Sequence, residues 1–284
     1  MATKTKEKTE QKTLTEEGVS NGKTALALIP PTSLVAPRAM SEAERTFIED
    51  SDEVPEAPSK IANIAVNHGG VEFVMPSGET IDGADGIEGF IVRYFDTRAY
   101  YKDAYSAKGE KAPPDCRSAD CITPDADVVK KQSADCYNCP QNAFGTAKVG
   151  KGKACPEHLR LVLVNPAFGN PPIAVLTLPP TSISIFKGGS MVVGGKRGYL
   201  DQLKAKRAAW QLIWTRIRLT KEEGAANCLP VFEMGEAIPD TPEGLAMVKA
   251  LAALNNQFGA ILKAMRRQPA NDDVPAPGSG DAAE

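Results

Sequence analysis

Cysteines crowd into one short part of this sequence. Five of the six lie between positions 116 and 155, namely Cys116, Cys121, Cys136, Cys139 and Cys155. Cys136 and Cys139 form a Cys-x-x-Cys pair, which presents two thiolates on one side of a small loop, as a tetrahedral zinc ion requires. Few apolar residues and many turn formers surround them. We therefore predict a loop-rich segment that a metal ion makes rigid.

Five cysteines compete for the four positions of such a site. Cys136 and Cys139 are the primary pair, Cys155 is the downstream ligand, and Cys116 and Cys121 are alternatives for the fourth position. A disulfide framework is one competing interpretation, but it is typical of short secreted chains, and the opening residues do not form a signal peptide. A redox pair is another, but it would normally lie at a strand-to-helix junction rather than among turn residues. We predict a structural Zn²⁺ site.

Charge divides the chain into three regions. Acidic residues outnumber basic ones by eleven to seven in residues 1–58 and by four to none in residues 268–284, whereas basic residues lead by 26 to 21 in residues 59–267. The two ends lack hydrophobic periodicity and are predicted to be a disordered N-terminal arm and a disordered acidic tail. A basic core between acidic ends favours polyanionic partners.

Residues 59–267 show strand patterns on both sides of a zinc insert at about positions 106–158. Runs of β-branched and aromatic residues bounded by Gly or Pro predict strands at 71–75, 87–101, 159–165, 173–178, 210–220 and 228–234, with 182–186 as a continuation. A short helix is expected at 199–206, and a long amphipathic helix is expected to begin at Pro242 after Thr241 as N-cap.

These elements predict a mainly β fold of the β-rich α+β type. An OB-like (oligonucleotide-binding), partly closed barrel with the inserted zinc segment and a C-terminal helix fits them, and a sandwich is the alternative. Strict alternation in the strand 87–101 places Val92 and Tyr94 on one face and Arg93 and Phe95 on the other.

Basic and aromatic residues interleave between Lys187 and Lys221. Nine basic residues stand there against one acid, Asp201, with Trp210 and Trp214 among them. Cations neutralise phosphates, and flat rings stack on unpaired bases, so the pattern favours single-stranded nucleic acid. The competing interpretation is a solvated face with its tryptophans in the core.

Catalysis finds little support, and we expect no enzymatic activity. The chain has only two histidines, and neither supplies the His-x-Glu of zinc deaminases. No Gly-x-Ser-x-Gly nucleophile elbow is present. The sequence contains no run of about eighteen apolar residues, so we predict no membrane-spanning helix.

Several motifs, taken together, have a familiar order. They comprise Pro114-Asp-Cys-x-Ser-x-Asp120, Cys136-x-x-Cys-Pro-x-Asn-x-Phe-Gly145, Gly150-Lys-Gly-Lys-Ala-Cys155 with an Arg-Leu strand after it, and Leu178-Pro-Pro-Thr-Ser182. This set resembles a group of tailed-phage and prophage proteins that look like single-stranded-DNA-binding proteins, over roughly residues 70–220. The resemblance implies zinc ligands at Cys116, Cys136, Cys139 and Cys155, with Cys121 as an extra thiol.

The plan of an OB fold with an inserted zinc segment and an acidic tail is similar to that of the zinc-bearing single-stranded-DNA-binding proteins of T-even phages. Their zinc ligands include a histidine in a spacing that this sequence does not follow. Only the plan is therefore shared.

The resulting expectation is a single-stranded-DNA-binding protein of phage replication or recombination, acting in the host bacterial cytoplasm without a membrane. The expected nucleic-acid contacts are Arg93, Tyr94, Arg98, Tyr100, Lys151, Lys153, Trp210, Trp214, Arg216 and Arg218. The acidic tail is expected to recruit replication or recombination proteins. A zinc-containing protein–protein adaptor and a metal-dependent nuclease are the alternatives.

Overall fold

The computed structural model describes residues 62–102, 113–148, 151–169, 172–188, 197–223, 225 and 227–267, together with residues 39, 41, 42 and 44. In α4, side chains are described as far as residue 260. Apart from those four positions, the predicted N-terminal arm (1–58) lies outside the described residues, as does the predicted acidic tail (268–284). At residues 41–44, the Ser41 amide donates to Glu44 Oε2 (2.7 Å) and the Glu44 amide donates to Ser41 Oγ (3.3 Å). This reciprocal pair is a capping box.

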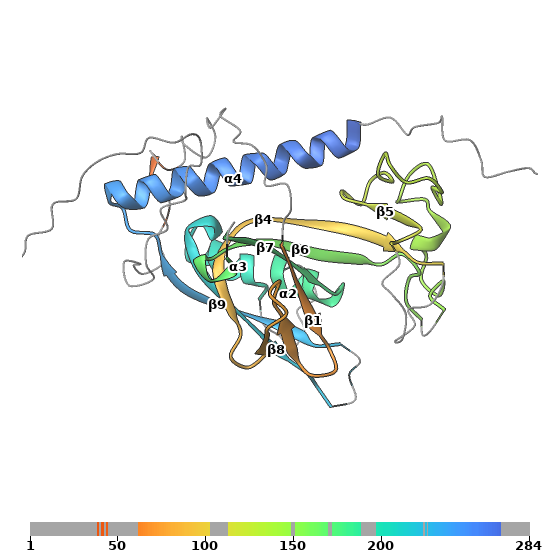
Figure 1. Ribbon diagram of the computed structural model, residues 1–284, viewed down its shortest axis with the longest axis horizontal. Helices are drawn as coiled ribbons and strands as arrows, with labels where there is room; N and C mark the ends of the chain where they lie inside the picture. The colour runs from red at the N-terminus through yellow and green to blue at the C-terminus, as the bar shows by residue number, and fades with distance from the viewer. Residues whose placement is uncertain are drawn as a thin grey trace, which may run out of the picture.

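One curled sheet of nine strands forms most of the described chain, in the shape of a half-barrel (Figure 1). Its order is β3-β2-β1-β7-β6-β4-β8-β9, and β5 pairs with the far end of β4. The pair β1–β7 is parallel, and the other pairs are antiparallel. The strands are β1 (Ala62–Asn67), β2 (Glu72–Val74), β3 (Thr80–Asp82), β4 (Ile87–Tyr100), β5 (Cys116–Ser118), β6 (Glu157–Val164), β7 (Ile173–Leu178), β8 (Ile213–Thr220) and β9 (Leu229–Ala237).

Helices cover both faces of this sheet. Figure 1 shows α4 (Pro242–Arg267) across one face and the shorter α2 (Thr181–Lys187) and α3 (Tyr199–Ala205) on the other. An inner core packs residues of α2 and α3 against β1, β6, β7 and β8, and an outer core packs α4 against β4, β6 and β7. Three short 3₁₀ turns complete the described elements: η2 (Pro140–Asn142), η3 (Pro166–Phe168) and η5 (Trp210–Leu212).

The curl brings the β1–β2 turn against the loop between β8 and β9. The Cys228 amide donates to His68 Nδ1 (3.1 Å), and Lys221 Nζ donates to the His68 carbonyl (2.5 Å). Strands distant in the sheet order therefore meet at one end of the half-barrel.

A β-bulge in β4 places Val92 and Tyr94 on opposite faces of the sheet. The register with β6 shifts between Ile91 and Arg93, so one extra residue is accommodated there. Val92 consequently joins the outer core together with Phe95, whereas Tyr94 packs against the inner core. The prediction that Val92 and Tyr94 share a face is wrong, because strict alternation holds only on each side of a bulge.

Two other predictions about elements are wrong. Residues 182–186 are not a strand but the middle of α2, where Ser182 and Phe186, four residues apart, are the buried pair. Trp210 belongs to η5, and the following strand begins only at Ile213. The expected strands at 87–101 and 173–178 and the helices at 199–206 and from Pro242 are confirmed, with end shifts of a residue or so.

The cysteine-rich segment lies beside the far ends of β4 and β6. We call its described residues, 113–148 and 151–155, the cysteine insert; β5 and η2 are its named elements. Within the part of the chain that the structure describes, no helix is long and apolar enough to span a bilayer.

Candidate metal centre and nucleic-acid interface

Four cysteines from separate parts of the insert line one cavity. Cys116, Cys136, Cys139 and Cys155 all contribute to its wall. Three are buried, Cys139 is half-buried, and all four are free thiols. Cys121 is absent from this wall. The cavity therefore groups the four cysteines that the resemblance implies.

Backbone contacts hold three of these four cysteines in place. Cys116 pairs with Tyr100 where β5 joins β4. The Cys136 amide donates to the Ile122 carbonyl (2.8 Å), and the Cys155 amide donates to the Gln141 carbonyl (2.9 Å). These contacts connect loops distant in sequence, and they orient the cysteines without help from a hydrophobic core.

The thiols also influence one another electrostatically. Burial raises the pKa of Cys155 to about 12; the Arg98 charge opposes this rise, and the thiols of Cys116, Cys139 and Cys136 add to it. Burial likewise raises the pKa of Cys136. Four thiolates in one cavity need a compensating cation, and a tetrahedral set of sulfur ligands is typical of structural zinc.

The donor set fits zinc in its chemistry. Yet among the described residues, no group of three or more His, Cys, Asp or Glu side chains is arranged so that it could hold a metal ion as it stands. The shared cavity indicates which thiols belong together, and it does not provide a closed coordination sphere. The zinc ion therefore stays a prediction.

Cys121 has a different environment. It is half-buried, with backbone φ of 62°, and burial raises its pKa to about 12, an effect that Arg98 opposes and Glu157 and Asp96 reinforce. Its neighbours are thus charged side chains of β4 and β6 rather than the other thiols.

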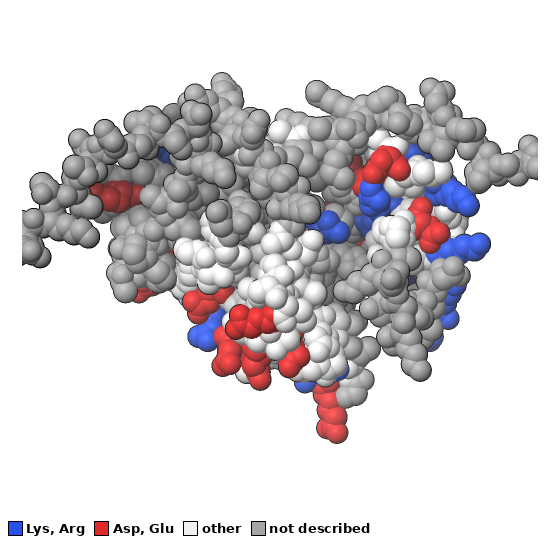
Figure 2. Space-filling view, viewed as in Figure 1, with Lys and Arg blue, Asp and Glu red and all other residues white. Residues whose placement is uncertain are grey.

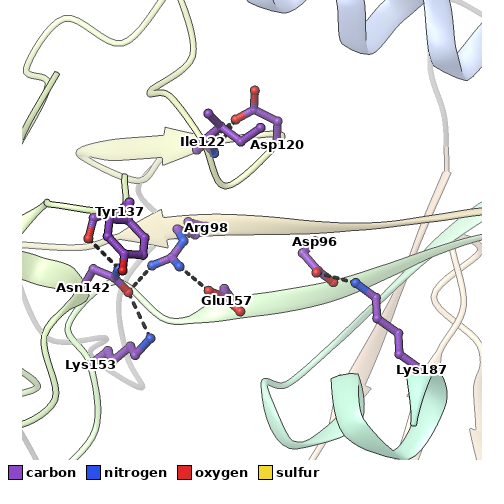
Figure 3. A network of polar contacts seen from close by, with 10 residues as sticks. Asp96, Arg98, Asp120, Ile122, Tyr137, Asn142, Lys153, Glu157 and Lys187 are labelled. Atoms are coloured by element: carbon purple, nitrogen blue, oxygen red, sulfur yellow. Dashed lines mark hydrogen bonds and ion pairs between the residues drawn. The ribbon is translucent and has the colours of Figure 1, made fainter. Parts of the chain in front are cut away.

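Arg98 connects the sheet to the cysteine insert (Figure 3). Its guanidinium, on β4, donates to Asn142 Oδ1 and to Glu157 Oε1, and the side chain is only 7 % exposed. Asn142 Oδ1 also accepts from Lys153 Nζ (3.0 Å), and Asn142 Nδ2 donates to the Tyr137 carbonyl (3.1 Å). Arg98 is one of the ten predicted nucleic-acid contacts. The structure instead gives it an internal role, because its charge is compensated inside the fold.

The predicted stacking aromatics mostly pack against the cores. Tyr94 lies against Trp210 (ring centroids 5.3 Å apart) and Phe186 (5.1 Å), and Lys187 Nζ lies 5.6 Å from the Tyr94 ring centre. Trp214 donates from Nε1 to Glu88 Oε2 (3.0 Å) and meets Phe90 edge-on. The competing interpretation, tryptophans as packing residues, describes these contacts better.

The basic side chains predicted to contact nucleic acid also lie in different parts of the fold. Arg93 Nη1 donates to the carbonyl and to Oδ1 of Asn255 in α4 (3.1 Å each). Arg216 pairs with Glu88, and Arg218 pairs with Glu233. Tyr100, Lys151 and Lys153 belong to the region of the cysteine insert. The structure does not bring the ten expected contact residues onto one surface.

Sequence reasoning missed two aromatic residues of the insert. Tyr137 is 85 % exposed and Phe144 is 80 % exposed. Tyr137 lies inside the Cys-x-x-Cys turn, among turn-forming residues and away from any apolar run. That position in the sequence could have indicated an exposed ring.

Comparison with protein-family models, characterised proteins and solved structures gave no match to this chain. The resemblance to phage proteins accordingly stays a prediction.

Proposed function

We propose that this protein binds single-stranded DNA through an OB-like, partly closed barrel whose cysteine insert holds a structural zinc ion. The main support for the proposal is that a curled sheet carries an insert in which four thiols line one cavity. Cys116, Cys136, Cys139 and Cys155 would hold the ion. Zinc with four thiolates has no open position for a substrate, so its contribution is rigidity.

The distribution of charge supports a polyanionic ligand at the insert. In Figure 2 Lys and Arg side chains lie mainly at the end that carries β5, whereas Asp and Glu dominate the lower tip. Exposed acids of that tip region are Glu79, Asp82, Asp85, Glu222 and Glu223. A strand of phosphates would be attracted to the first end and repelled by the second.

The described insert carries a slight excess of positive charge, six basic side chains against five aspartates. Asp125 and Asp127 pair with Arg117, and Asp120 and Asp135 accept hydrogen bonds from nearby backbone amides. The exposed lysines of the insert are Lys130, Lys131, Lys148 and Lys151. Asp115 and Asp127 are exposed as well, so the support from charge is the small excess of lysine and arginine at this end.

The resemblance to phage proteins extends the proposal to DNA replication or recombination in a host bacterium. It is the sole support for that setting.

The test is fluorescence anisotropy of a labelled thirty-mer of deoxythymidine, titrated with the full chain at several salt concentrations and against a duplex of equal length. We expect selective binding of the single strand that weakens as salt rises, because phosphate contacts release counterions. Equal affinity for the duplex would contradict the selectivity for single strands. No binding at low salt would contradict the proposal altogether and favour a protein–protein adaptor.

A further inference from the structure

We propose that Tyr137 and Phe144 of the cysteine insert form the platform on which unpaired bases stack, with Lys153 and Lys151 beside it for the phosphates. This inference rests on the proposed function and names the contact residues for it. It moves the expected stacking surface away from Trp210 and Trp214, whose rings are engaged in packing.

The exposure of these rings is the first observation. Tyr137 and Phe144 are 85 % and 80 % exposed, and among the large apolar residues of the described chain only Val129, at 83 %, is comparable. An aromatic side chain gains stability chiefly by burial, so a ring left almost entirely in water contributes little to folding. Two such rings on one insert indicate a surface with a ligand.

The second observation is clustering. The large hydrophobic residues that are exposed in the described chain are Tyr101, Ile122, Val129, Tyr137 and Phe144. Four of them belong to the insert, and Tyr101 directly follows β4; the strands and helices contribute none among the side chains that are described. Scattered apolar residues need no explanation, whereas a concentration on one segment marks an interaction site.

The third observation is the way the rings are mounted. Asn142 donates to the Tyr137 carbonyl (3.1 Å) and accepts from Lys153 Nζ (3.0 Å). Lys153 in turn lies 5.0 Å from the Phe144 ring centre and forms a backbone bridge with Phe144. Asn142 therefore joins the two aromatic positions, and Arg98 anchors Asn142 to β4. A platform whose backbone is held in this way loses less entropy when a ligand binds than a free loop does.

The lysines beside the rings indicate which kind of ligand would bind there. Lys153 lies at the Phe144 ring, and Lys151 is exposed two residues before it. Flat rings with adjacent cations match a strand that alternates unpaired bases and phosphates. A duplex keeps its bases stacked internally, so it would offer these rings no faces. Single-stranded nucleic acid fits the combination better than an uncharged protein surface.

The test compares full-length variants by anisotropy with the labelled deoxythymidine thirty-mer. We expect Tyr137→Ala and Phe144→Ala each to weaken binding by about 5-fold or more, which corresponds to the lower limit for one stacked base. Tyr137→Phe keeps the ring and should retain affinity. Val129→Ser, at an equally exposed apolar position, is the matched control and should bind as the wild type does.

Salt dependence separates stacking from charge. The double variant Tyr137→Ala/Phe144→Ala should keep the wild-type slope of log affinity against log salt. Lys151→Ala should reduce the magnitude of that slope by about 0.7, the value for one phosphate contact on a single strand. Because the rings are exposed, their removal should leave the urea midpoint unchanged, so a loss of binding is not a loss of folding.

The outcomes distinguish this inference from the proposed function. Wild-type protein that binds no single strand overturns both. Wild-type protein that binds, with a double variant of equal affinity, overturns this inference alone and directs attention to β8. A dimer that dissociates in the double variant without a change in DNA affinity also overturns it, and identifies the platform as a contact between two copies. Equal losses in Val129→Ser and the ring variants overturn it too, because a general apolar surface would then be responsible.

Discussion

At the scale of single residues, Arg98 shows how one side chain connects two parts of the molecule. It is the buried member of a network that joins β4, the start of β6 and the cysteine insert. Its partner Glu157 is 35 % exposed, so solvent screens part of their attraction. Loss of Arg98 would also leave its two half-buried partners, Asn142 and Glu157, without these hydrogen bonds.

Replacement of Arg98 by Met keeps most of the side-chain volume and removes these bonds. We expect Arg98→Met to lower the free energy of unfolding by about 1.5–3 kcal/mol, the range for hydrogen bonds to a charged group. Urea unfolding monitored by circular dichroism measures this value.

Arg218→Met is the matched control, because Arg218 and Glu233 form an ion pair in which each side chain is 38 % exposed. Its expected cost is below about 1 kcal/mol. If both variants lost the same small amount, the internal role of Arg98 would be wrong.

At the scale of elements, His68 holds the β1–β2 turn against the loop before β9. Its Nδ1 accepts a hydrogen bond from the Cys228 amide, so that nitrogen must carry no proton. Burial, and then the Lys221 charge, lower the pKa of His68 from its ordinary value of 6.5. The unfolded chain therefore takes up a proton at a pH where the folded chain does not, and stability rises with pH in this range.

This contact should weaken as the solution is acidified. The contribution of His68 is complete above pH 6.5, and it is lost as pH falls through the lower pKa of the folded state. We expect the urea midpoint to fall less between pH 7.5 and pH 5 in His68→Asn, which keeps an acceptor without a titrating proton, than in the wild type.

The other histidine contributes to both proteins equally. Burial, and then Arg160, lower the pKa of His158, so its contribution has the same sign. The difference between wild type and His68→Asn therefore isolates His68. Identical pH profiles for the two proteins would show that the turn contact does not depend on its protonation.

At the scale of the whole molecule, the described chain has two hydrophobic cores and a third part without one. The inner and outer cores lie on the two faces of the sheet. Within the insert, order comes from hydrogen bonds and from the four thiols around one cavity. Metal removal should consequently affect the insert and leave the sheet folded.

Hydrogen exchange followed by mass spectrometry tests this division. We expect one zinc ion per chain and, after chelation, loss of protection at the amides of Asp125, Cys136 and Cys155, which are hydrogen-bonded within the insert. Peptides from β6 and α4 should keep their protection, because their side chains pack in the cores.

Two cysteine variants serve as the comparison. Cys136→Ser/Cys139→Ser should reproduce the effect of chelation, whereas Cys121→Ser should retain the zinc ion. If Cys121→Ser loses the zinc ion, Cys121 is one of its ligands. Uniform loss of amide protection over the whole chain after chelation would show that the sheet does not stay folded independently of the insert.

The sequence by itself determined the local parts of this protein. Runs of β-branched, aromatic and other apolar residues bounded by Gly or Pro predicted β4 and β7, and Thr241 with Pro242 predicted where α4 begins, since torsional preference and capping act between neighbours in the chain. The spacing of cysteines likewise indicated a candidate metal centre. Residues 182–186 misled because their alternation is also compatible with a helix that buries positions four apart.

Only the tertiary structure decided which surfaces meet. The bulge at Val92 changes the face of everything after it in β4, and no periodicity in the sequence signals it. Arg98 meets Glu157 across 59 positions, and Arg93 meets Asn255 across 162. Several residues predicted to contact nucleic acid, among them Arg93 and Arg98, therefore make contacts within the fold. Tyr137 and Phe144, which were not predicted, are exposed to solvent. The physical reason is that burial and ion pairing depend on partners far away in sequence, which local preferences do not encode.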